Sequence, residues 1–270
     1  MVPRVGHHHD HHAEVERAEW QSYLTDYHND RPGITEQLLA DAVDRHRIRP
    51  YPWLIEPLRA SSGPILDLAC GSAPTRPLLA GRSWLGVDVS AGELAVAAAA
   101  GRGPLRARAD RLPLGDHTVA AVCAAMCLPV LTPLDAVLAE LTRVLAPGGI
   151  LAALVPSETV WGRGVFDWWR IMRALRVRTL PWPNPRARDE LPEVLRACGF
   201  VIDRSERRVF RREITGPDDA ALVIDGLYLP ETGSEQIMAA EHALASWARR
   251  GRQLALPLRR VVAHRPTTVR

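Results

Sequence analysis

The sequence predicts an α/β fold in which a doubly wound, mostly parallel sheet carries helices on both faces. Short apolar segments without alternation, such as residues 63–69 and 118–125, are typical of strands buried on both faces. Segments with helical spacing separate them, and the one at residues 133–149 has a single apolar face and ends in Pro-Gly-Gly. Strands that alternate with helices in this way predict right-handed crossovers within one sheet.

The expected elements follow this alternation along the chain. Residues 13–60 are helical in character with a breaker at Arg31–Gly33, and Ser90 is expected to cap a later helix. Strands are expected at residues 63–69, 83–89, 104–110, 118–125, 150–156, 201–214 and 252–266. Helices beyond residue 60 are expected at residues 75–80, 90–100, 134–145, 161–177, 190–199 and within 218–249.

Composition limits the classes of function. All 34 basic residues are arginine, which excludes a lysine Schiff base or a lysine general base. The formal charge of +3 is mild, so nucleic acid is not indicated as a partner. The longest uncharged segment, residues 118–134, is too short to span a membrane and contains two prolines. No signal peptide is visible, so the protein is expected in the cytoplasm.

Neither the cysteines nor the histidines predict a metal site. Cys70, Cys123, Cys127 and Cys198 lie in apolar segments without zinc-binding spacing, and we expect them to be reduced and buried. The histidine-rich run His7–His12 lies at the N-terminus. We therefore expect residues 1–12 to form a disordered tail without a functional metal.

Three aspartates lie at the ends of consecutive predicted strands. Asp67 ends the first strand, Asp88 ends the second and Asp110 follows the third. Ligands of an open parallel sheet bind at the carboxyl ends of its strands. There, Asp88 would accept hydrogen bonds from a ribose diol, Asp110 from the exocyclic amine of an adenine, and Asp67 would anchor an ammonium group. A ligand that carries these three groups is S-adenosylmethionine.

The turn after the first strand, Ala69–Ser72, does not match a phosphate-binding loop. It lacks the G-K-[ST] of one such loop and the first and last glycines of the G-x-G-x-x-G fingerprint. Its small residues instead let a ligand approach the backbone closely. Each aspartate alone has an alternative explanation as a helix cap or turn residue, and only their shared position at three strand ends indicates a ligand site.

Four segments in this order and spacing resemble the class I S-adenosylmethionine-dependent methyltransferases, most closely their type 11, small-molecule branch. They read ILDLACGSA, WLGVDVSAGEL, ARADRLPLGD and ELTRVLAPGGILAALVPS, and they lie within residues 63–157. The resemblance implies a Rossmann-like, seven-stranded, mostly parallel sheet with an antiparallel last strand. It also implies a helical N-terminal lid over residues 13–60, a cofactor-binding core over 61–157, and substrate-side insertions with the remaining strands over 158–270.

The resemblance further implies the cofactor contacts, with S-adenosylhomocysteine as the product. An aspartate like Asp88 holds the ribose hydroxyls, and one like Asp110 contacts the adenine amine. The other expected contacts are Asp67, Ala69, Cys70 and Gly71 at the methionine part, Val89, Arg111 and Leu112 near the adenine, Ala124, Ala125 and Met126 at the methyl group, and Tyr27 and Arg31 from the lid. The chain departs from the family pattern at Ala69 and Ala73, which replace glycines, and at Val119-Ala120, which replaces Phe-Asp.

Family members share no fixed catalytic residue, so candidates come from the segments expected to cover the cofactor. His28 is the first choice for a general base, because an imidazole titrates near neutral pH, and Glu158 is the second. An ordinary surface histidine is the alternative for His28. The residues expected to contact the methyl acceptor are Tyr23, Trp161, Phe166, Trp168, Trp169 and Tyr228, although such aromatic residues often belong to a core.

The sequence therefore predicts a methyltransferase that uses S-adenosylmethionine and modifies an O, N or C atom of a small molecule. Family analogy favours a secondary metabolite as the acceptor. Two alternatives stay open, a nucleic-acid base methyltransferase and a non-catalytic cofactor-binding module. Many enzymes of the first kind carry Asn/Asp-Pro-Pro-Tyr/Phe after the fourth strand, where this chain reads AAMCLPV at residues 124–130. The expected assembly is a monomer or homodimer that does not bind membranes.

Overall fold

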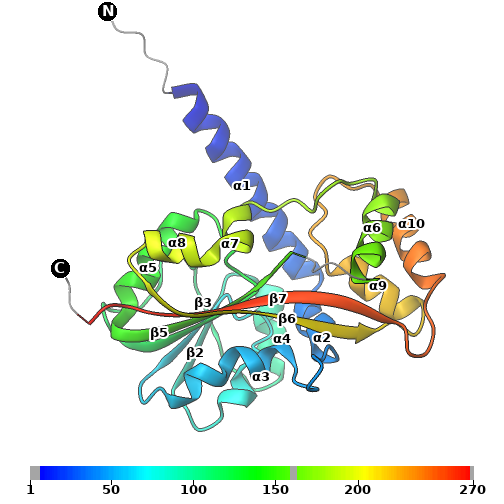
Figure 1. The fold of residues 1–270 in the computed structure, drawn as a ribbon. Coiled ribbons are helices and arrows are strands. Elements are labelled where there is room, and N and C mark those ends of the chain that lie inside the picture. Colours follow the sequence, from blue (N-terminus) through cyan, green and yellow to red (C-terminus); the bar gives the residue numbers. More distant parts are fainter. Residues whose placement is uncertain (1–6, 159–162, 268–270) are drawn as a thin grey trace, which may run out of the picture.

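A seven-stranded sheet forms the centre of the molecule, and the computed structural model describes residues 7–158 and 163–267 (Figure 1). The strands are β1 (Ile65–Leu68), β2 (Trp84–Asp88), β3 (Leu105–Arg106), β4 (Val119–Ala125), β5 (Leu145–Pro156), β6 (Val201–Glu213) and β7 (Gln253–His264). Their order is β3-β2-β1-β4-β5-β7-β6. The first five run parallel, whereas β7 is antiparallel to both β5 and β6. The predicted doubly wound sheet with an antiparallel last strand is confirmed.

Side chains of the central strands alternate between two apolar cores, one on each face of the sheet. In β1, Ile65 belongs to one core, and Leu66 and Leu68 belong to the other. In β5, Leu154 and Val155 divide in the same way. Since both faces are covered, these strands carry apolar residues at nearly every position, with Asp67 of β1 as an exception, which explains their mostly apolar segments in the sequence.

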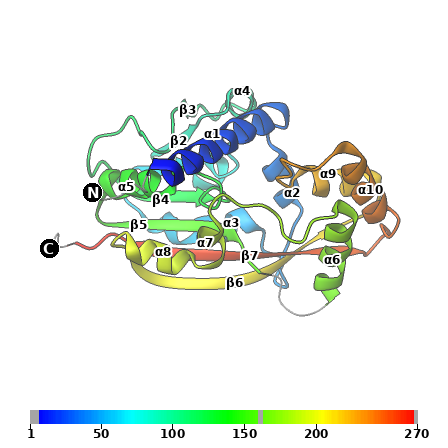
Figure 2. The ribbon, with the colours of Figure 1, turned by 90° about the horizontal axis from the view of Figure 1, so that it is seen from above.

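Helices cover both faces of this sheet. They are α1 (His7–Asp30), α2 (Ile34–Ala40), α3 (Pro50–Ile55), α4 (Ala91–Ala99), α5 (Leu134–Val144), α6 (Arg163–Leu175), α7 (Pro185–Asp189), α8 (Leu191–Ala197), α9 (Pro217–Asp225) and α10 (Ser234–Ala245), with short 3-10 helices η1 (Glu56–Ala60) and η2 (Arg76–Leu79). Helices α5, α7 and α8 pack on one face, and α3 packs on the other (Figure 1). Helix α1 lies beside α4 (Figure 2).

The N-terminal part differs from the prediction in two places. Helix α1 begins at His7, so the helix includes part of the segment expected as a disordered tail; residues 1–6 lie outside the described residues. The helical segment expected after the breaker at Arg31–Gly33 is interrupted, because α2 ends at Ala40. There the chain leaves the helix because the backbone of Val43 pairs with that of Arg211 in β6, at 3.1 and 2.8 Å. A separate helix, α3, then starts with Pro50 in its first turn.

The core of the fold follows the prediction more closely. Ser90 caps α4, because its hydroxyl accepts a hydrogen bond from the Glu93 N–H at 3.2 Å. Strand β3 is shorter than expected, at Leu105–Arg106, and β5 begins at Leu145 instead of Ile150. These differences shift element boundaries and leave the order of the elements unchanged.

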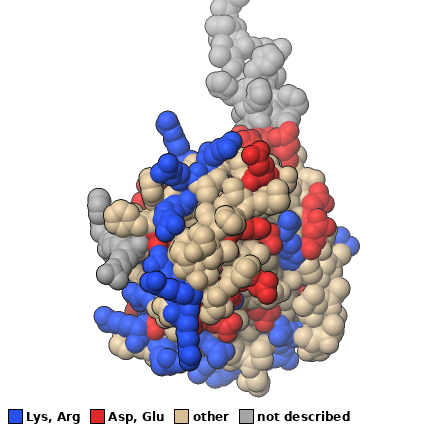
Figure 3. All heavy atoms as spheres, turned by 90° about the vertical axis from the view of Figure 1, so that its right-hand side faces the viewer, with Lys and Arg blue, Asp and Glu red and all other residues tan. Residues whose placement is uncertain are grey.

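The face that carries the helical insertions has separate basic and acidic areas (Figure 3). Arg170, Arg173 and Arg176 border a shallow groove between α6 and α10. Among the helices described here, none is both long enough and apolar enough to cross a membrane.

Candidate functional site

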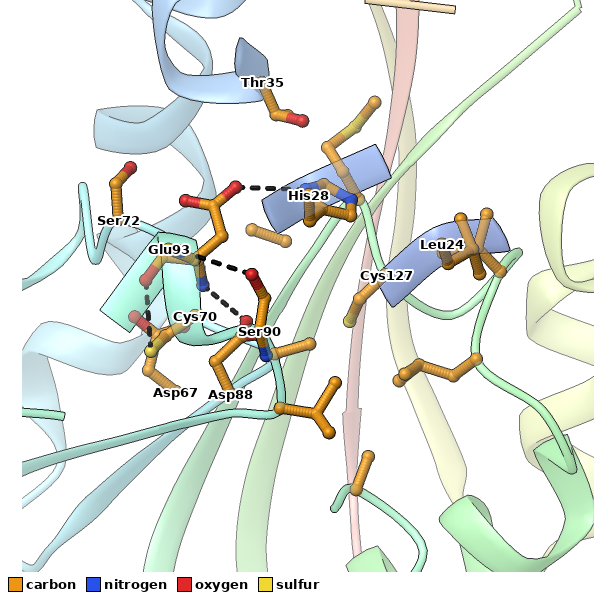
Figure 4. Close-up of a pocket in the computed structure, with 18 of the residues that line it drawn as sticks. Leu24, His28, Thr35, Asp67, Cys70, Ser72, Asp88, Ser90, Glu93 and Cys127 are labelled. Carbon is orange, nitrogen blue, oxygen red and sulfur yellow. Dashed lines mark hydrogen bonds and ion pairs between the residues drawn. The ribbon is translucent and has the colours of Figure 1, made fainter. Parts of the chain in front are cut away.

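A cavity lies at the carboxyl ends of β1, β2 and β4, and residues of α1 form part of its wall (Figure 4). The three aspartates that follow the first three strands, Asp67, Asp88 and Asp110, all line it. The parallel register of the strands brings these side chains together, because β1 pairs with β2 and β2 with β3. The structure thus unites the three carboxylates that the sequence placed at one edge of the sheet.

The turn between β1 and η2 has an unusual backbone. Ala69, Gly71 and Ala73 have positive φ angles of 48°, 54° and 59°, in the left-handed region. At Gly71 the φ angle alone favours glycine, since a Cβ there would be in ordinary van der Waals contact with Glu93. The two alanines therefore adopt the conformation that glycine favours, at some cost in stability.

Replacement of Ala69 by glycine is expected to stabilise the fold by about 0.5–1 kcal/mol, because glycine tolerates this φ angle. Thermal unfolding of the variant and the parent would measure the change. Ala95→Gly is the matched control, since Ala95 is exposed within α4 and the same substitution should destabilise there by a similar amount. A lower melting temperature for Ala69→Gly would contradict the assignment of strain to this turn.

Asp88 is buried, and backbone groups fix its orientation. Its two carboxylate oxygens accept hydrogen bonds from the N–H of Gly71 at 2.8 Å and of Ser90 at 2.9 Å. Burial raises the pKa of this carboxyl, and the two N–H groups oppose the rise. Each oxygen retains a lone pair, so a pair of hydroxyl groups in the cavity can donate to them.

Asp67 is only 1% exposed and is the most enclosed of the three acids. One oxygen accepts hydrogen bonds from the Thr75 hydroxyl and, at 3.3 Å, from the indole N–H of Trp84. The other oxygen has no hydrogen-bond partner among the described residues. Burial raises the pKa of Asp67 to about 7. A buried carboxyl with one unpartnered oxygen on a cavity wall fits a cationic ligand group.

Asp110 is held by Arg108 in a two-fold ion pair, with N–O distances of 2.9 and 2.7 Å, and this pair lowers its pKa. Val89 lies near it on the wall. Two expected neighbours do not line the cavity. Arg111 is exposed to solvent, and Leu112 is buried in the core while its N–H donates to Glu140 at 2.7 Å. The chain turns after Asp110, so these two side chains point away.

Some of the other predicted cofactor contacts line the first cavity, and one is buried in the apolar core instead. Cys70, Ala125 and Met126 line the cavity together with Ala69 and Gly71. Ala124 does not, because it alternates with Ala125 along β4 and packs in the core on the far face of the sheet.

His28 reaches the cavity from α1 and links two other side chains. Its Nδ1 lies 3.0 Å from Oε1 of Glu93 (Figure 4). Its Nε2 lies 3.1 Å from the hydroxyl of Tyr228. The second oxygen of Glu93 accepts the N–H of Gly33 at 2.9 Å. Burial raises the pKa of Tyr228 well above its usual value, so its hydroxyl stays protonated.

Glu93 is a site residue that the sequence reasoning missed. It occupies the third position of α4 behind the Ser90 cap, where a glutamate ordinarily belongs to a capping box. Here its buried carboxylate instead contacts the N-terminal segment, through His28 and Gly33. No local sequence signal distinguishes these two uses.

Three residues of the N-terminal segment that were predicted at the site contact the region of Asp225 and Leu229 instead. The Tyr27 hydroxyl donates to the carbonyl of Asp225 at 2.5 Å, and Arg31 forms an ion pair with the Asp225 carboxylate at 3.8 Å. The Tyr23 hydroxyl accepts the N–H of Leu229 at 2.7 Å. These contacts tie α1 to the segment after α9, and none of the three side chains lines the cavity.

A second cavity adjoins the first, and the two share Thr35, Met126 and Tyr228. Its walls are mostly apolar. They come from α2, α6, residues 179–188, the segment after α9, and β7. The apolar side chains that line it are Leu38, Leu39, Met126, Trp168, Met172, Leu180, Trp182, Leu227, Leu256 and Leu258. Glu158 lines this cavity and is exposed, so it lies outside the aspartate cavity.

The aromatic wall predicted from α6 is corrected by the structure. Phe166 and Trp169 are 70% and 55% exposed and lie on the outer side of α6. Trp168 faces inward instead, and its indole N–H donates to the carbonyl of Ala255 at 2.7 Å. Helical periodicity places Trp168 with Ile171 and Met172, so its neighbour Trp169 turns outward. Trp161 lies outside the described residues.

The structure shows no metal-binding cluster of three or more His, Cys, Asp or Glu side chains within its described part. Cys70, Cys123 and Cys127 are free and buried, as predicted, and Cys198 is free and half-buried.

Comparison with known proteins places the central part of the chain in a family. Residues 66–153 match the Methyltransferase domain family. This central part of the chain therefore resembles a methyltransferase domain. A malonyl-[acyl-carrier protein] O-methyltransferase of Alcanivorax borkumensis is 36% identical over 125 residues, covering 43% of this chain and 42% of that protein. A demethylmenaquinone methyltransferase of Mycobacterium tuberculosis is 34% identical over 139 residues, covering 49% and 58%.

The chain therefore spans about half the length of these curated relatives. The fold extends further than the sequence match. A solved structure of a putative methyltransferase from Bacillus halodurans superposes with a TM-score of 0.55 at 17% identity, covering 80% of this chain and 99% of that one. The [4+2]-cyclase SpnF gives 0.52 at 21% identity, covering 81% and 80%. These likenesses confirm the Rossmann-like methyltransferase fold predicted from the sequence.

Proposed function

We propose that this methyltransferase transfers a methyl group from S-adenosylmethionine to a small molecule. The observation that carries the proposal is that Asp67, Asp88 and Asp110 line one cavity. A second, mostly apolar cavity meets the first at Met126. In this proposal residues 61–157 hold the cofactor. Residues 158–270, with α2, form most of the acceptor cavity.

The walls of the first cavity fit the cofactor group by group. The unpartnered oxygen of Asp67 suits the ammonium of the methionine part, and the backbone-fixed carboxylate of Asp88 suits the ribose hydroxyls. Asp110 and Val89 lie where the adenine would rest. When bound, S-adenosylmethionine supplies a methyl group on a positively charged sulfur, which is already activated for transfer.

The chain itself then has two tasks, to position the acceptor and to exclude water. Met126 lies where the two cavities meet, at the end of β4, with a φ angle of 62° that turns the chain there. Helix α1 forms the cover through Gln21, Leu24 and Thr25. This arrangement supports direct transfer between neighbouring cavities.

The relatives support a small acceptor over a nucleic acid. Both curated relatives are named for acceptors other than nucleic acid, malonyl-[acyl-carrier protein] and demethylmenaquinone. The acceptor cavity of this chain is mostly apolar and is built from its own insertions. We propose a small, largely apolar molecule as the class of acceptor, with a natural product as one example.

Asp88→Ala is expected to weaken the binding of S-adenosylhomocysteine and S-adenosylmethionine at least tenfold, about 1.4 kcal/mol, because two charge-assisted hydrogen bonds to the ribose are lost. Isothermal titration calorimetry measures both affinities. Asp116→Ala is the matched control, since Asp116 is an exposed aspartate outside the cavity. Equal affinity of Asp88→Ala and the parent would refute the ribose assignment, and a parent that binds neither compound would refute the proposed function.

A further inference from the structure

Three side chains from distant parts of the sequence form a continuous hydrogen-bonded chain where the two cavities meet. Glu93 of α4 contacts His28 of α1, and His28 contacts Tyr228 of the segment after α9. Glu93 and His28 line the first cavity, and Tyr228 lines both. These hydrogen bonds therefore connect the buried carboxylate of Glu93 with Tyr228, which lines the second cavity.

The chemistry of Glu93 fixes the direction of these hydrogen bonds. A carboxylate only accepts, and one Glu93 oxygen already accepts from the Gly33 N–H, so Nδ1 of His28 carries the proton in its contact with the other oxygen. In a neutral imidazole Nε2 is then the acceptor and takes the hydroxyl proton of Tyr228. With its only proton directed at His28, the Tyr228 oxygen presents lone pairs to a molecule in the second cavity.

Carboxylates face one end of this series of side chains, and protonated hydroxyl and thiol groups face the other. Asp88 and Glu93 face His28 from the side of β2 and α4. Tyr23, Tyr27 and Cys127 face Tyr228, and all three keep their protons. An imidazolium at this position is balanced by two nearby carboxylates.

We propose that the acceptor is an apolar molecule whose reacting hydroxyl group donates to the Tyr228 oxygen and passes its proton along Tyr228 and His28 toward Glu93. The proposal rests on the proposed function and names the acceptor class for it. A hydroxyl is the acceptor group that matches, since it must lose a proton during methylation and it donates to lone pairs. Tyr228 is the catalytic residue in this scheme, and His28 and Glu93 are positioning residues.

The step balances as follows. The acceptor oxygen bonds to the methyl carbon as the carbon–sulfur bond breaks, and the sulfur keeps the electron pair. The acceptor proton moves to the Tyr228 oxygen, while the Tyr228 proton moves to Nε2 of His28. The imidazolium, paired with Glu93, later releases one proton to solvent, so the products are a methyl ether, S-adenosylhomocysteine and a proton.

The walls of the second cavity support an apolar body for this acceptor. Trp168, Trp182 and Met172 supply large polarisable surfaces. The charged side chain of Arg188 at the wall is already paired with Asp189 through two contacts of 2.6 and 2.7 Å. A flat hydroxylated ring fits these properties better than a charged acceptor.

Binding of 2-naphthol and naphthalene to the complex with S-adenosylhomocysteine tests the acceptor class. Tryptophan fluorescence reports binding, because Trp168 and Trp182 line the cavity. We expect 2-naphthol to bind about tenfold more tightly than naphthalene, through one hydrogen bond to Tyr228. Tyr228→Phe should remove that preference. Met172→Trp should fill the cavity and weaken both probes at least tenfold, whereas the outward-facing Trp169→Phe should change neither affinity.

Equal binding of the two probes by the parent, or unchanged binding by Met172→Trp, would overturn the inference. The affinity for S-adenosylhomocysteine, measured first for every variant, confirms that each variant is folded. A parent that does not bind S-adenosylhomocysteine would refute the proposed function, whereas normal binding with no preference for 2-naphthol would refute only the acceptor class.

Nuclear magnetic resonance of the His28 ring tests the positioning role without any acceptor. We expect the proton on Nδ1 in the neutral ring, because the Glu93 carboxylate that faces Nδ1 only accepts hydrogen bonds. A purely structural contact would not require this tautomer. A proton on Nε2 of the neutral ring would contradict the proposed path of proton transfer.

Discussion

Replacement of Asp67 by asparagine is expected to remove a pH-dependent loss of stability of up to about 4 kcal/mol. The pKa of Asp67 rises from 3.8 to about 7 in the fold, mainly because burial disfavours the charged carboxylate. Each pKa unit corresponds to about 1.4 kcal/mol of free energy. The hydrogen bonds from Thr75 and Trp84 offset only part of the cost of burial.

The protons bound by the folded and unfolded states determine whether Asp67 makes the protein more or less stable as the pH rises. Between about pH 4 and pH 7 the folded protein keeps the Asp67 proton, whereas the unfolded chain has released it. The contribution of this group to the free energy of unfolding is therefore complete below pH 4, falls as the pH rises, and is lost above pH 7. Asparagine has no proton to lose, so the variant should gain stability relative to the parent over this interval.

Chemical denaturation of both proteins from pH 4 to pH 8 measures the difference. The curve for Asp67→Asn minus the parent should rise with pH and level off near pH 7. Asp116→Asn, at an exposed aspartate, is the control and should show no such rise. A flat difference for Asp67→Asn would show that the carboxyl is ionised throughout this range.

The same carboxyl links cofactor binding to proton release. An ammonium group beside Asp67 favours its charged form, so binding of S-adenosylmethionine at pH 6 should release up to about one proton. Calorimetry in two buffers with different ionisation enthalpies would detect that proton. Asp67→Asn should bind without releasing it, which separates this effect from the titration of other groups.

The parts of the fold that follow local rules were predictable from the sequence. Strands β1 and β4 are buried on both faces, so their mostly apolar residues without alternation identified them, and Ser90 identified the start of α4. The positions of Asp67 and Asp88 followed directly from these strands, because parallel strands end at a common edge. No knowledge of distant packing was needed.

The rest of the site depends on contacts between segments that are far apart in the chain. Glu93 contacts His28 across 65 positions, and His28 contacts Tyr228 across 200. Which aromatic residue of α6 faces the acceptor cavity depends on the rotation of that helix against β7, where Trp168 binds the Ala255 carbonyl. Periodicity gives the spacing of a helical face and does not say which neighbour that face will meet.

Arg212 shows how such distant contacts join the elements that line the second cavity. It lies in β6 and is 5% exposed. Its guanidinium donates to the carbonyls of Gln37 and Leu38 in α2, at 2.8 and 3.3 Å, and to the carboxylate of Asp219 in α9, at 3.2 Å. One buried side chain thus joins the sheet, the end of α2 and the insertion helix α9.

Arg212→Met is expected to lower the stability by about 3–5 kcal/mol, because the substitution leaves helix carbonyls without a donor and Asp219 without its counter-charge. Methionine retains the apolar stem, so lost volume contributes little. Denaturant unfolding measures the effect. Arg211→Met is the matched control. The side chain of Arg211 is exposed, so this substitution should change the free energy of unfolding by less than about 0.5 kcal/mol.

The two cavities should respond differently to this change. Leu38 and Leu39 of α2 line the acceptor cavity, whereas Asp67 and Asp88 stand on strands that Arg212 does not touch. Under conditions where Arg212→Met stays folded, binding of 2-naphthol should weaken several-fold and binding of S-adenosylhomocysteine should change little. Equal weakening of both would mean that α2 and the sheet move as one unit, and that Arg212 stabilises the whole site instead of one wall of it.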